Sequence, residues 1–277
     1  MGGLAFDQQA PWQEADYALV GPIDNRLQEI ATHRFPFNTI CHLGRDFGIG
    51  VRWGCSGALF RPRRLITAAH CLFSLKINRA PARIMVAPGR RDRDVLPYGQ
   101  RAAIAAYVPR GFISARNRAE RRANDYGLVV LKRGFPQLQR FMPLRSLSNR
   151  ELDRLQRDKL KLTISGYPAD RPVGTQWRHS EILRRYTSTR LLYSTDTCPG
   201  HSGSPVWVRH KGQAVIVAIH TSGILDERGR SHGCKKGTVM APPGSLNSGV
   251  RLTPEVVANL RDPQRLVGGR PPMVRVL

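Results

Sequence analysis

The stretch Asp196-Thr197-Cys198-Pro199-Gly200-His201-Ser202-Gly203-Ser204-Pro205 decides how the rest of the chain is interpreted. Its small residues around Ser202 predict a tight turn with few side chains and outward-pointing backbone N–H groups. Such a turn suits a nucleophile, because the Ser202 hydroxyl can attack a carbonyl while the N–H groups of Gly200 and Ser202 face the developing oxyanion. The same composition is also found in inert surface loops, so other stretches must supply the partners of Ser202.

Two apolar strands carry those partners. Leu65-Ile66-Thr67-Ala68-Ala69-His70-Cys71 leads into a histidine, which can accept a proton near neutral pH. Asn124-Asp125-Tyr126-Gly127-Leu128-Val129-Val130-Leu131 places an acid at the start of a strand, where a buried carboxylate can orient an imidazole. The sequence therefore predicts His70 as the general base, Asp125 as its orienting acid and Ser202 as the nucleophile.

The order His, Asp, Ser with these flanks resembles the chymotrypsin-like serine proteases, and most of all their bacterial glutamyl endopeptidase branch. The resemblance extends from about Gly21 to Asp262, and its further motifs are Gly21-Pro22-Ile23-Asp24-Asn25-Arg26, Phe35-Pro36-Phe37, Ser165-Gly166-Tyr167-Pro168 and Ala218-Ile219-His220. It implies an all-β fold of two six-stranded antiparallel β-barrels with a short C-terminal helix. It also implies a serine endopeptidase that hydrolyses peptide bonds through an acyl-enzyme and needs no cofactor.

Short apolar runs that alternate with turn residues predict a barrel or sandwich independently of the resemblance. We expect a first barrel over 21–145, with strands at 39–43, 57–60, 65–67, 84–87, 103–108 and 127–131. A second barrel over 146–262 would have strands at 162–165, 182–187, 191–194, 205–208, 215–220 and 237–240. Residues 1–20 are interpreted as an N-terminal extension or the remnant of a pro-segment, and 263–277 as a basic, proline-rich tail.

Two local patterns predict helices and one predicts a loop. Ser148-Asn149-Arg150-Glu151 is a capping-box pattern, and Thr253-Pro254-Glu255 combines an N-cap, a proline and a first-turn acid. The arginine-rich segment 110–124 lacks alternation and is expected to be an exposed loop.

The net charge of +24, from 44 basic and 20 acidic residues, is the unusual feature of the composition. Such a charge attracts acidic peptides and, nonspecifically, polyanions, and salt weakens this attraction. The arginines are dispersed and not interleaved with aromatic residues, which favours a solvated basic surface over a nucleic-acid site. No apolar run of about 18 residues predicts a membrane span. We expect a monomer that acts on protein or peptide substrates.

The resemblance also assigns four of the five cysteines. It implies a Cys55–Cys71 disulfide that braces the histidine loop and a Cys198–Cys234 disulfide at the nucleophile turn, leaving Cys41 over. An alternative metal site, built from Cys41-His42 and His232-Gly233-Cys234, lacks paired C-x-x-C spacing, so no metal is expected. Two disulfides favour a secreted or periplasmic protein. The start of the chain, however, lacks the pattern of a signal peptide, and an intracellular location is the alternative.

The sequence leaves more than one substrate specificity open. Thr197 and His220 match positions that bind the substrate carboxylate in glutamyl endopeptidases, and Thr221 matches one whose hydroxyl supports the catalytic Asp. Asp196, however, stands where trypsin pairs with Arg or Lys, so cleavage after a basic residue is the alternative. His201 replaces the Asp that the trypsin zymogen switch requires. A catalytically idle, basic module that binds polyanions is a further alternative.

Overall fold

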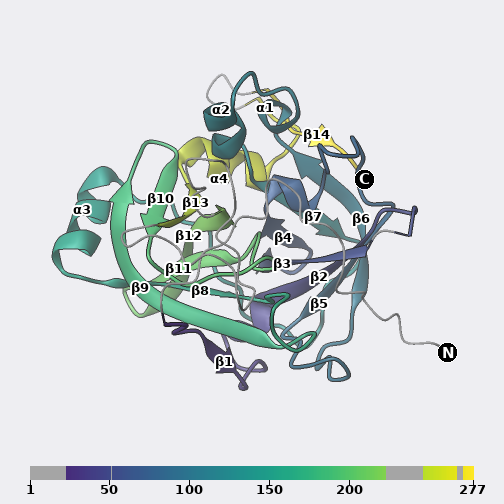
Figure 1. The fold of residues 1–277 in the computed structure, drawn as a ribbon, viewed down its shortest axis with the longest axis horizontal. Coiled ribbons are helices and arrows are strands. Elements are labelled where there is room, and N and C mark those ends of the chain that lie inside the picture. Colours follow the sequence, from purple (N-terminus) through teal and green to yellow (C-terminus); the bar gives the residue numbers. More distant parts are fainter. Residues whose placement is uncertain (1–22, 51, 223–245, 267–270) are drawn as a thin grey trace.

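The computed structural model describes residues 23–50, 52–222, 246–266 and 271–277, which form two β-barrels that lie against each other (Figure 1). In the first barrel each strand pairs antiparallel with its neighbours, and the pairing of β6 with β7 closes the ring. Around the ring its strands are β2 (Ile40–Asp46), β3 (Arg52–Arg61), β4 (Arg64–Thr67), β7 (Gly127–Leu131), β6 (Arg101–Val108) and β5 (Arg83–Pro88).

The second barrel repeats this arrangement, and the pairing of β8 with β9 closes it. Its strands are β8 (Lys161–Gly166), β9 (Gln176–Tyr186), β10 (Arg190–Tyr193), β13 (Asn247–Arg251), β12 (Gln213–Ser222) and β11 (Pro205–His210). A short strand, β1 (Leu27–Glu29), adds to the outer side of β9. The predicted fold of two six-stranded antiparallel barrels is confirmed. The strand predicted at 237–240 lies outside the described residues, and β13 was not predicted.

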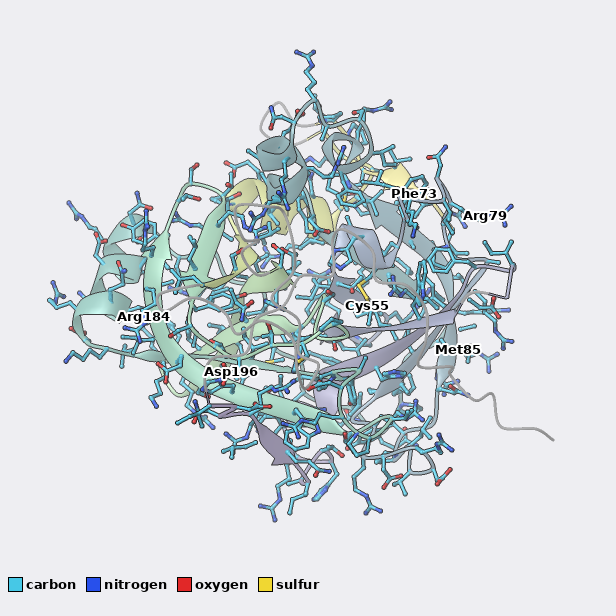
Figure 2. The ribbon with its side chains drawn as sticks, viewed as in Figure 1. Cys55, Phe73, Arg79, Met85, Arg184 and Asp196 are labelled. Carbon is cyan, nitrogen blue, oxygen red and sulfur yellow. A yellow bond between two sulfur atoms is a disulfide. The ribbon has the colours of Figure 1, made fainter. Side chains whose placement is uncertain are left out.

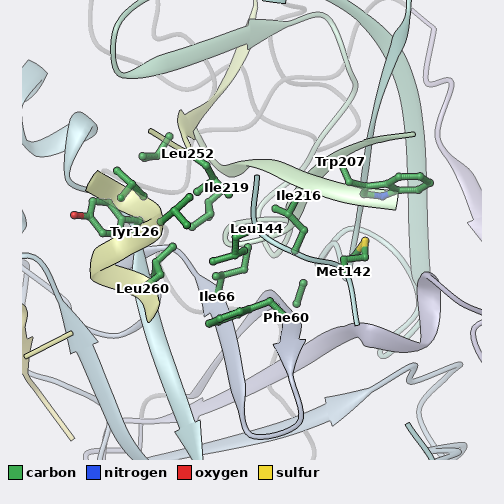
Figure 3. Close-up of a cluster of buried hydrophobic side chains, with 14 of the residues drawn as sticks. Phe60, Ile66, Tyr126, Met142, Leu144, Trp207, Ile216, Ile219, Leu252 and Leu260 are labelled. Atoms are coloured by element: carbon green, nitrogen blue, oxygen red, sulfur yellow. The ribbon is translucent and has the colours of Figure 1, made fainter. Parts of the chain in front are cut away.

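A continuous apolar cluster joins the two barrels. Ile66 of β4 and Phe60 of β3 belong to the same cluster as Ile216 and Ile219 of β12 (Figure 3). Two further clusters fill the barrels themselves. Residues 214–222 of β12 are all buried, because one face of the strand points into its own barrel and the other toward the junction. Burial on both faces explains why these strands read as unbroken apolar runs in the sequence.

Both predicted helices are present, and the predicted residues cap them. The Ser148 side chain accepts a hydrogen bond from the Glu151 N–H at the start of α3 (Asn149–Arg157), and Glu151 completes the capping box. Thr253 caps α4 (Pro254–Arg261), whose first residue is a proline. Helix α4 packs Val256 and Leu260 into the cluster at the junction of the barrels. Two single-turn 3-10 helices also occur, η1 (Phe37–Thr39) and η2 (Ala69–Cys71).

The segment 110–124 is not a simple loop, so that expectation was wrong. It contains two short helices, α1 (Arg110–Ile113) and α2 (Arg118–Ala123). The Asn117 side chain accepts a hydrogen bond from the Glu120 N–H at 2.9 Å, which caps α2. Helix α2 ends immediately before Asn124 and Asp125, and it therefore fixes where the predicted catalytic acid enters the first barrel.

The C-terminal tail returns to the first barrel. Strand β14 (Val274–Arg275) pairs antiparallel with Val108 and Tyr107 of β6, and Val276 packs against the core of that barrel. No helix within the described ranges is both long and apolar enough to cross a membrane.

Many of the described arginines are exposed, whereas Arg26, Arg45, Arg90, Arg190 and Arg251 are buried. Figure 2 labels Arg79 on the first barrel and Arg184 on the second, and these two exposed side chains lie on opposite sides of the structure. The interpretation of the charge as a solvated basic surface stays a prediction.

Candidate active site

His70 and Asp125 meet at the ends of two paired strands. Strand β4 leads into η2, which carries His70, and β7 begins two residues after Asp125; Thr67 lies opposite Gly127 in the register of these strands. Asp125 Oδ2 lies 2.8 Å from His70 Nδ1, and Asp125 Oδ1 accepts a hydrogen bond from the His70 backbone N–H at 3.0 Å. One buried carboxylate thus holds both the ring and the backbone of His70. With Nδ1 as the donor to Asp125, Nε2 is the ring nitrogen that can accept a proton.

The loop that carries His70 is braced from two sides. Cys55 of β3 and Cys71 form the expected disulfide, with a Cα–Cα distance of 6.3 Å (Figure 2). Arg45 Nη1 donates to the backbone carbonyls of both His70 and Cys71 at 3.3 Å. Although the Cys55 and Cys71 sulfurs lie close to the His70 ring, they are bonded to each other, so neither is a thiolate that could bind a metal.

The Ser202 turn of the second barrel packs against the first barrel, next to the loop that carries His70. The Ser202 carbonyl accepts a hydrogen bond from the Ser56 N–H at 2.9 Å and lies 3.6 Å from Cys71 Sγ. On the other side, the Gly203 N–H donates to the His220 carbonyl at 2.8 Å. The backbone on both sides of Ser202 is therefore positioned by strands from both barrels.

Gly200 occupies a position that excludes larger residues. Its φ is +95°, and a Cβ atom would lie 2.4 Å from the Tyr167 carbonyl oxygen. The Ser56 hydroxyl donates to the Gly200 carbonyl at 2.7 Å and accepts from the Tyr167 N–H at 2.8 Å. Ser56 thus sets the orientation of the Gly200 peptide group. The sequence analysis missed this residue, whose only signal was its place next to Cys55.

His201 is a buried, neutral part of the same turn. Its Nδ1 accepts a hydrogen bond from the Cys198 N–H at 3.0 Å. Burial, followed by the positive charge of Arg26, lowers the pKa of His201 well below its usual value. A neutral imidazole therefore braces this turn from within, where trypsin uses a charged Asp.

His220 is also neutral. Burial, followed by the charges of Arg190 and His70, lowers the pKa of His220 to about 3. The Tyr193 hydroxyl lies 2.9 Å from His220 Nδ1, and the His220 N–H donates to the Ser204 carbonyl at 2.9 Å. His220 is therefore fixed through both its ring and its backbone, next to the Ser202 turn. Thr197 is likewise buried, on the approach to that turn.

The carboxylate of Asp196 is engaged by two other segments of the protein. Its Oδ2 accepts a hydrogen bond from the Asn25 N–H at 2.9 Å and lies 3.3 Å from His179 Nδ1. The next residue in the N-terminal segment, Arg26, is anchored 2.6 Å from Asp170. The N-terminal segment is thus attached, through Asp196, to the stretch that leads into the Ser202 turn.

Thr221 has a different partner from the one that the resemblance implied. Its Oγ1 accepts a hydrogen bond from Arg190 Nη2 at 3.0 Å. Within the described residues, Asp125 receives its hydrogen bonds from His70, and the expected support by the Thr221 hydroxyl is not among them. The sequence analysis did not single out Arg190, because one more arginine carries no signal in a chain this basic.

Of the remaining cysteines, the structure describes Cys41 and Cys198 but not Cys234. Cys234 lies outside the described residues, so the Cys198–Cys234 disulfide stays a prediction. Cys41 is a buried free thiol, and burial raises its pKa. A buried neutral thiol is a poor nucleophile, which leaves Cys41 as a packing residue.

Known proteins resemble this chain along most of its length. The family model described as trypsin matches residues 25–237. A glutamyl endopeptidase of Bacillus licheniformis is 27% identical over 254 residues, which covers 89% of this chain and 70% of that protein. A Bacillus subtilis protein named an extracellular metalloprotease is also 27% identical, over 86% of this chain and 67% of that protein.

A solved structure of a Glu endopeptidase in complex with MPD shares the fold. It superposes with a TM-score of 0.69 at 24% identity, covering 88% of this chain and 98% of that one. The protease Anisep from Arthrobacter nicotinovorans superposes with a TM-score of 0.58 at 16% identity, over 82% of this chain and 93% of that one.

Proposed function

This chain belongs to the trypsin family of serine peptidases, and on that basis we propose that Ser202 is its nucleophile, His70 its general base and Asp125 the acid that orients His70. The observation that carries this assignment is the two-point contact between Asp125 and His70, next to the backbone of the Ser202 turn. A buried carboxylate in this position selects the tautomer that can accept a proton and stabilises the imidazolium that forms.

The reaction is acyl transfer to water. His70 Nε2 removes the hydroxyl proton of Ser202 as its oxygen bonds to the substrate carbonyl carbon, and the N–H groups of Gly200 and Ser202 stabilise the oxyanion. The imidazolium then gives this proton to the leaving amine as the peptide bond breaks, and an acyl-enzyme remains. A water molecule, deprotonated by His70, attacks the ester, and the return of the proton releases Ser202 and the carboxylic acid product.

We propose that the residue before the scissile bond is Glu. The Tyr193 hydroxyl can donate to His220 Nδ1 at 2.9 Å, which places the His220 proton on Nε2 as a donor for a carboxylate. Thr197, buried near the same turn, would supply a hydroxyl donor. The names of the relatives point the same way, since several of them are called glutamyl endopeptidases.

Cleavage after Arg or Lys is the second candidate, and Asp196 is the residue that favours it. A carboxylate that binds a basic substrate side chain must be available to it, whereas Asp196 Oδ2 accepts the Asn25 N–H in this structure. That contact supports the acidic preference, because a carboxylate already bound to the N-terminal segment is less available to a basic substrate side chain. The alternative that is not an enzyme is a catalytically inactive, basic module that binds polyanions.

The proposal extends to location and partners. The Cys55–Cys71 disulfide and the extracellular relative of Bacillus subtilis support a protein that acts outside the cytoplasm on protein or peptide substrates. We expect it to act as a monomer. The net charge of +24 would attract acidic substrates from a distance.

A peptide library that varies only the residue before the scissile bond tests this function. The full chain and a chain lacking residues 1–19 are assayed beside a Ser202→Ala control. Cleavage after Glu that disappears in the control supports the proposal, and dependence on removal of 1–19 would identify a pro-segment. Cleavage after Arg or Lys would assign specificity to Asp196. Absence of cleavage by both forms, together with no labelling of Ser202 by an active-site serine reagent, would favour the binding module.

A further inference from the structure

Two arginines share the same hydroxyl groups beside the candidate active site. Arg190 of β10 donates through Nη2 to Thr221 Oγ1, Ser222 Oγ and Ser248 Oγ, at 3.0, 3.2 and 2.5 Å. Arg122 of α2 donates through Nη2 to the same Ser222 and Ser248 hydroxyls, at 3.2 and 3.1 Å. The two guanidinium groups are thus held near each other by shared acceptors, although their like charges repel.

Among the described residues, the charge of Asp125 acts on both arginines of this pair, but no carboxylate is in direct contact with them. Within the ranges that the structure describes, no carboxylate lies at salt-bridge distance from Arg122 or Arg190, and their acceptors are hydroxyls and, for Arg190, the Arg122 carbonyl. Burial lowers the pKa of both arginines, and the charge of Arg122 lowers that of Arg190 further, to about 10. Removing two cations from water without a counter-ion in direct contact is unfavourable. The arrangement would be stabilised by an anion that arrives from outside.

The pair lies within a few residues of the groups assigned to catalysis and specificity. Arg122 precedes Asp125 by three residues, and Thr221 and Ser222 directly follow His220 in β12. Arg190 is buried, whereas Arg122 is half-buried and therefore the one that a ligand can reach. A substrate whose acidic side chain contacts His220 would place its preceding residues along Thr221 and Ser222 if it follows this strand in an extended conformation.

We propose that Arg122 and Arg190 form a second anion subsite, which binds an acidic side chain of the substrate in the three positions before the residue at the scissile bond. This inference rests on the proposed peptidase function and deepens it: the protein would select clustered acids rather than a single Glu. Arg122 makes the contact through its guanidinium N–H groups, while Arg190 adds charge and holds the hydroxyls in place. An acidic peptide is favoured over a polyanion because Arg190 is buried and Arg122 is half-buried, which limits how many charges can reach the pair.

Paired peptides test the subsite. Each pair has the accepted residue before the scissile bond and either Glu or Gln at one of the three preceding positions, so the pair differs by one charge at nearly constant shape. We expect the ratio of kcat/KM for Glu over Gln to be about tenfold to a hundredfold at one position. In Arg122→Gln this ratio should fall to about 1. Arg118→Gln, which removes an exposed charge from the same helix without touching the shared hydroxyls, should retain it.

The outcome can be separated from that of the peptidase proposal. The dissociation constants of the same peptide pairs are measured with Ser202→Ala and with Ser202→Ala combined with Arg122→Gln, and this readout needs no catalysis. A Glu preference in binding that disappears without Arg122 supports the subsite even if no peptide is cleaved. Equal affinity for both peptides of every pair, or an equal loss of preference in Arg118→Gln, would overturn it.

Discussion

Replacing Gly200 by alanine should reduce turnover strongly and leave the fold intact. The Cβ atom of an alanine would lie 2.4 Å from the Tyr167 carbonyl oxygen and 2.9 Å from the Ala169 nitrogen, both of them backbone atoms. Neither can move as a flexible side chain would. The turn must therefore shift or rotate, and the φ of +95° adds strain for any residue with a side chain.

The expected loss of kcat follows from the hydrogen-bond donor that the turn carries. The Gly200 N–H is one of two donors proposed for the oxyanion, and the Gly200 carbonyl is fixed by Ser56 Oγ at 2.7 Å. Displacing the turn would move the Gly200 N–H away from the oxyanion and so remove one donor, which costs about a hundredfold to a thousandfold in kcat. The Michaelis constant should change much less, because the donor acts mainly in the transition state.

Gly212 provides a matched control for the backbone strain. It has a φ of +79° in the exposed turn between β11 and β12, and a Cβ atom there would meet nothing within 4 Å. Gly212→Ala thus introduces a similar strain without the clash, at the opposite end of β11 from the Ser202 turn. Steady-state kinetics on a Glu peptide and thermal melting would be measured for both variants. A Gly200→Ala enzyme with kcat within about threefold of the control would refute the assignment of this donor.

Four further predictions follow from described contacts. Asp125→Asn should lower kcat by about ten-thousandfold with an unchanged circular dichroism spectrum, because the amide favours the wrong His70 tautomer; a loss below tenfold would contradict the triad. Cys55→Ala with Cys71→Ala should lower the free energy of unfolding by about 3 kcal/mol in urea titrations, since the bridge spans 16 residues, and Cys41→Ala serves as the comparison without a disulfide. Burial, and then the charges of neighbouring arginines, lowers the pKa of His42 from 6.5 to about 3. Burial, and then the charges of Arg190 and His70, lowers the pKa of His220 by the same amount. Between these pH values the unfolded chain binds more protons than the folded one, so this stability is present above pH 6.5 and lost as the pH falls. Each histidine should contribute a loss of about 2 kcal/mol between pH 6.5 and 5, and equal urea midpoints at pH 7 and 5 would contradict this. His201→Leu leaves the Cys198 N–H without its acceptor, which costs about 1 to 3 kcal/mol and should lower kcat, whereas His201→Asn can restore both by offering an amide oxygen.

Much of the candidate site can be predicted from the sequence because its signals are local. A nucleophile turn needs Gly200 and Gly203 at positive φ, and these residues stand in the chain next to Ser202. The caps of α3 and α4 likewise depend on residues within one helical turn. Strand positions were found where apolar runs were continuous, whereas the short helices of 110–124 were missed because arginines dominate them.

The sequence by itself determined the fold class, the family and the residue types available for catalysis. Only the tertiary structure decided which of those residues meet. Ser56 reaches Gly200 across 144 residues, and Asn25 reaches Asp196 across 171. Arg190 of β10 donates to the Thr221 hydroxyl of β12, although β13 lies between these strands in the sheet. The physical reason is that a hydrogen bond depends on distance and direction in space, and strand pairing and barrel packing bring together groups whose separation along the chain carries no such information.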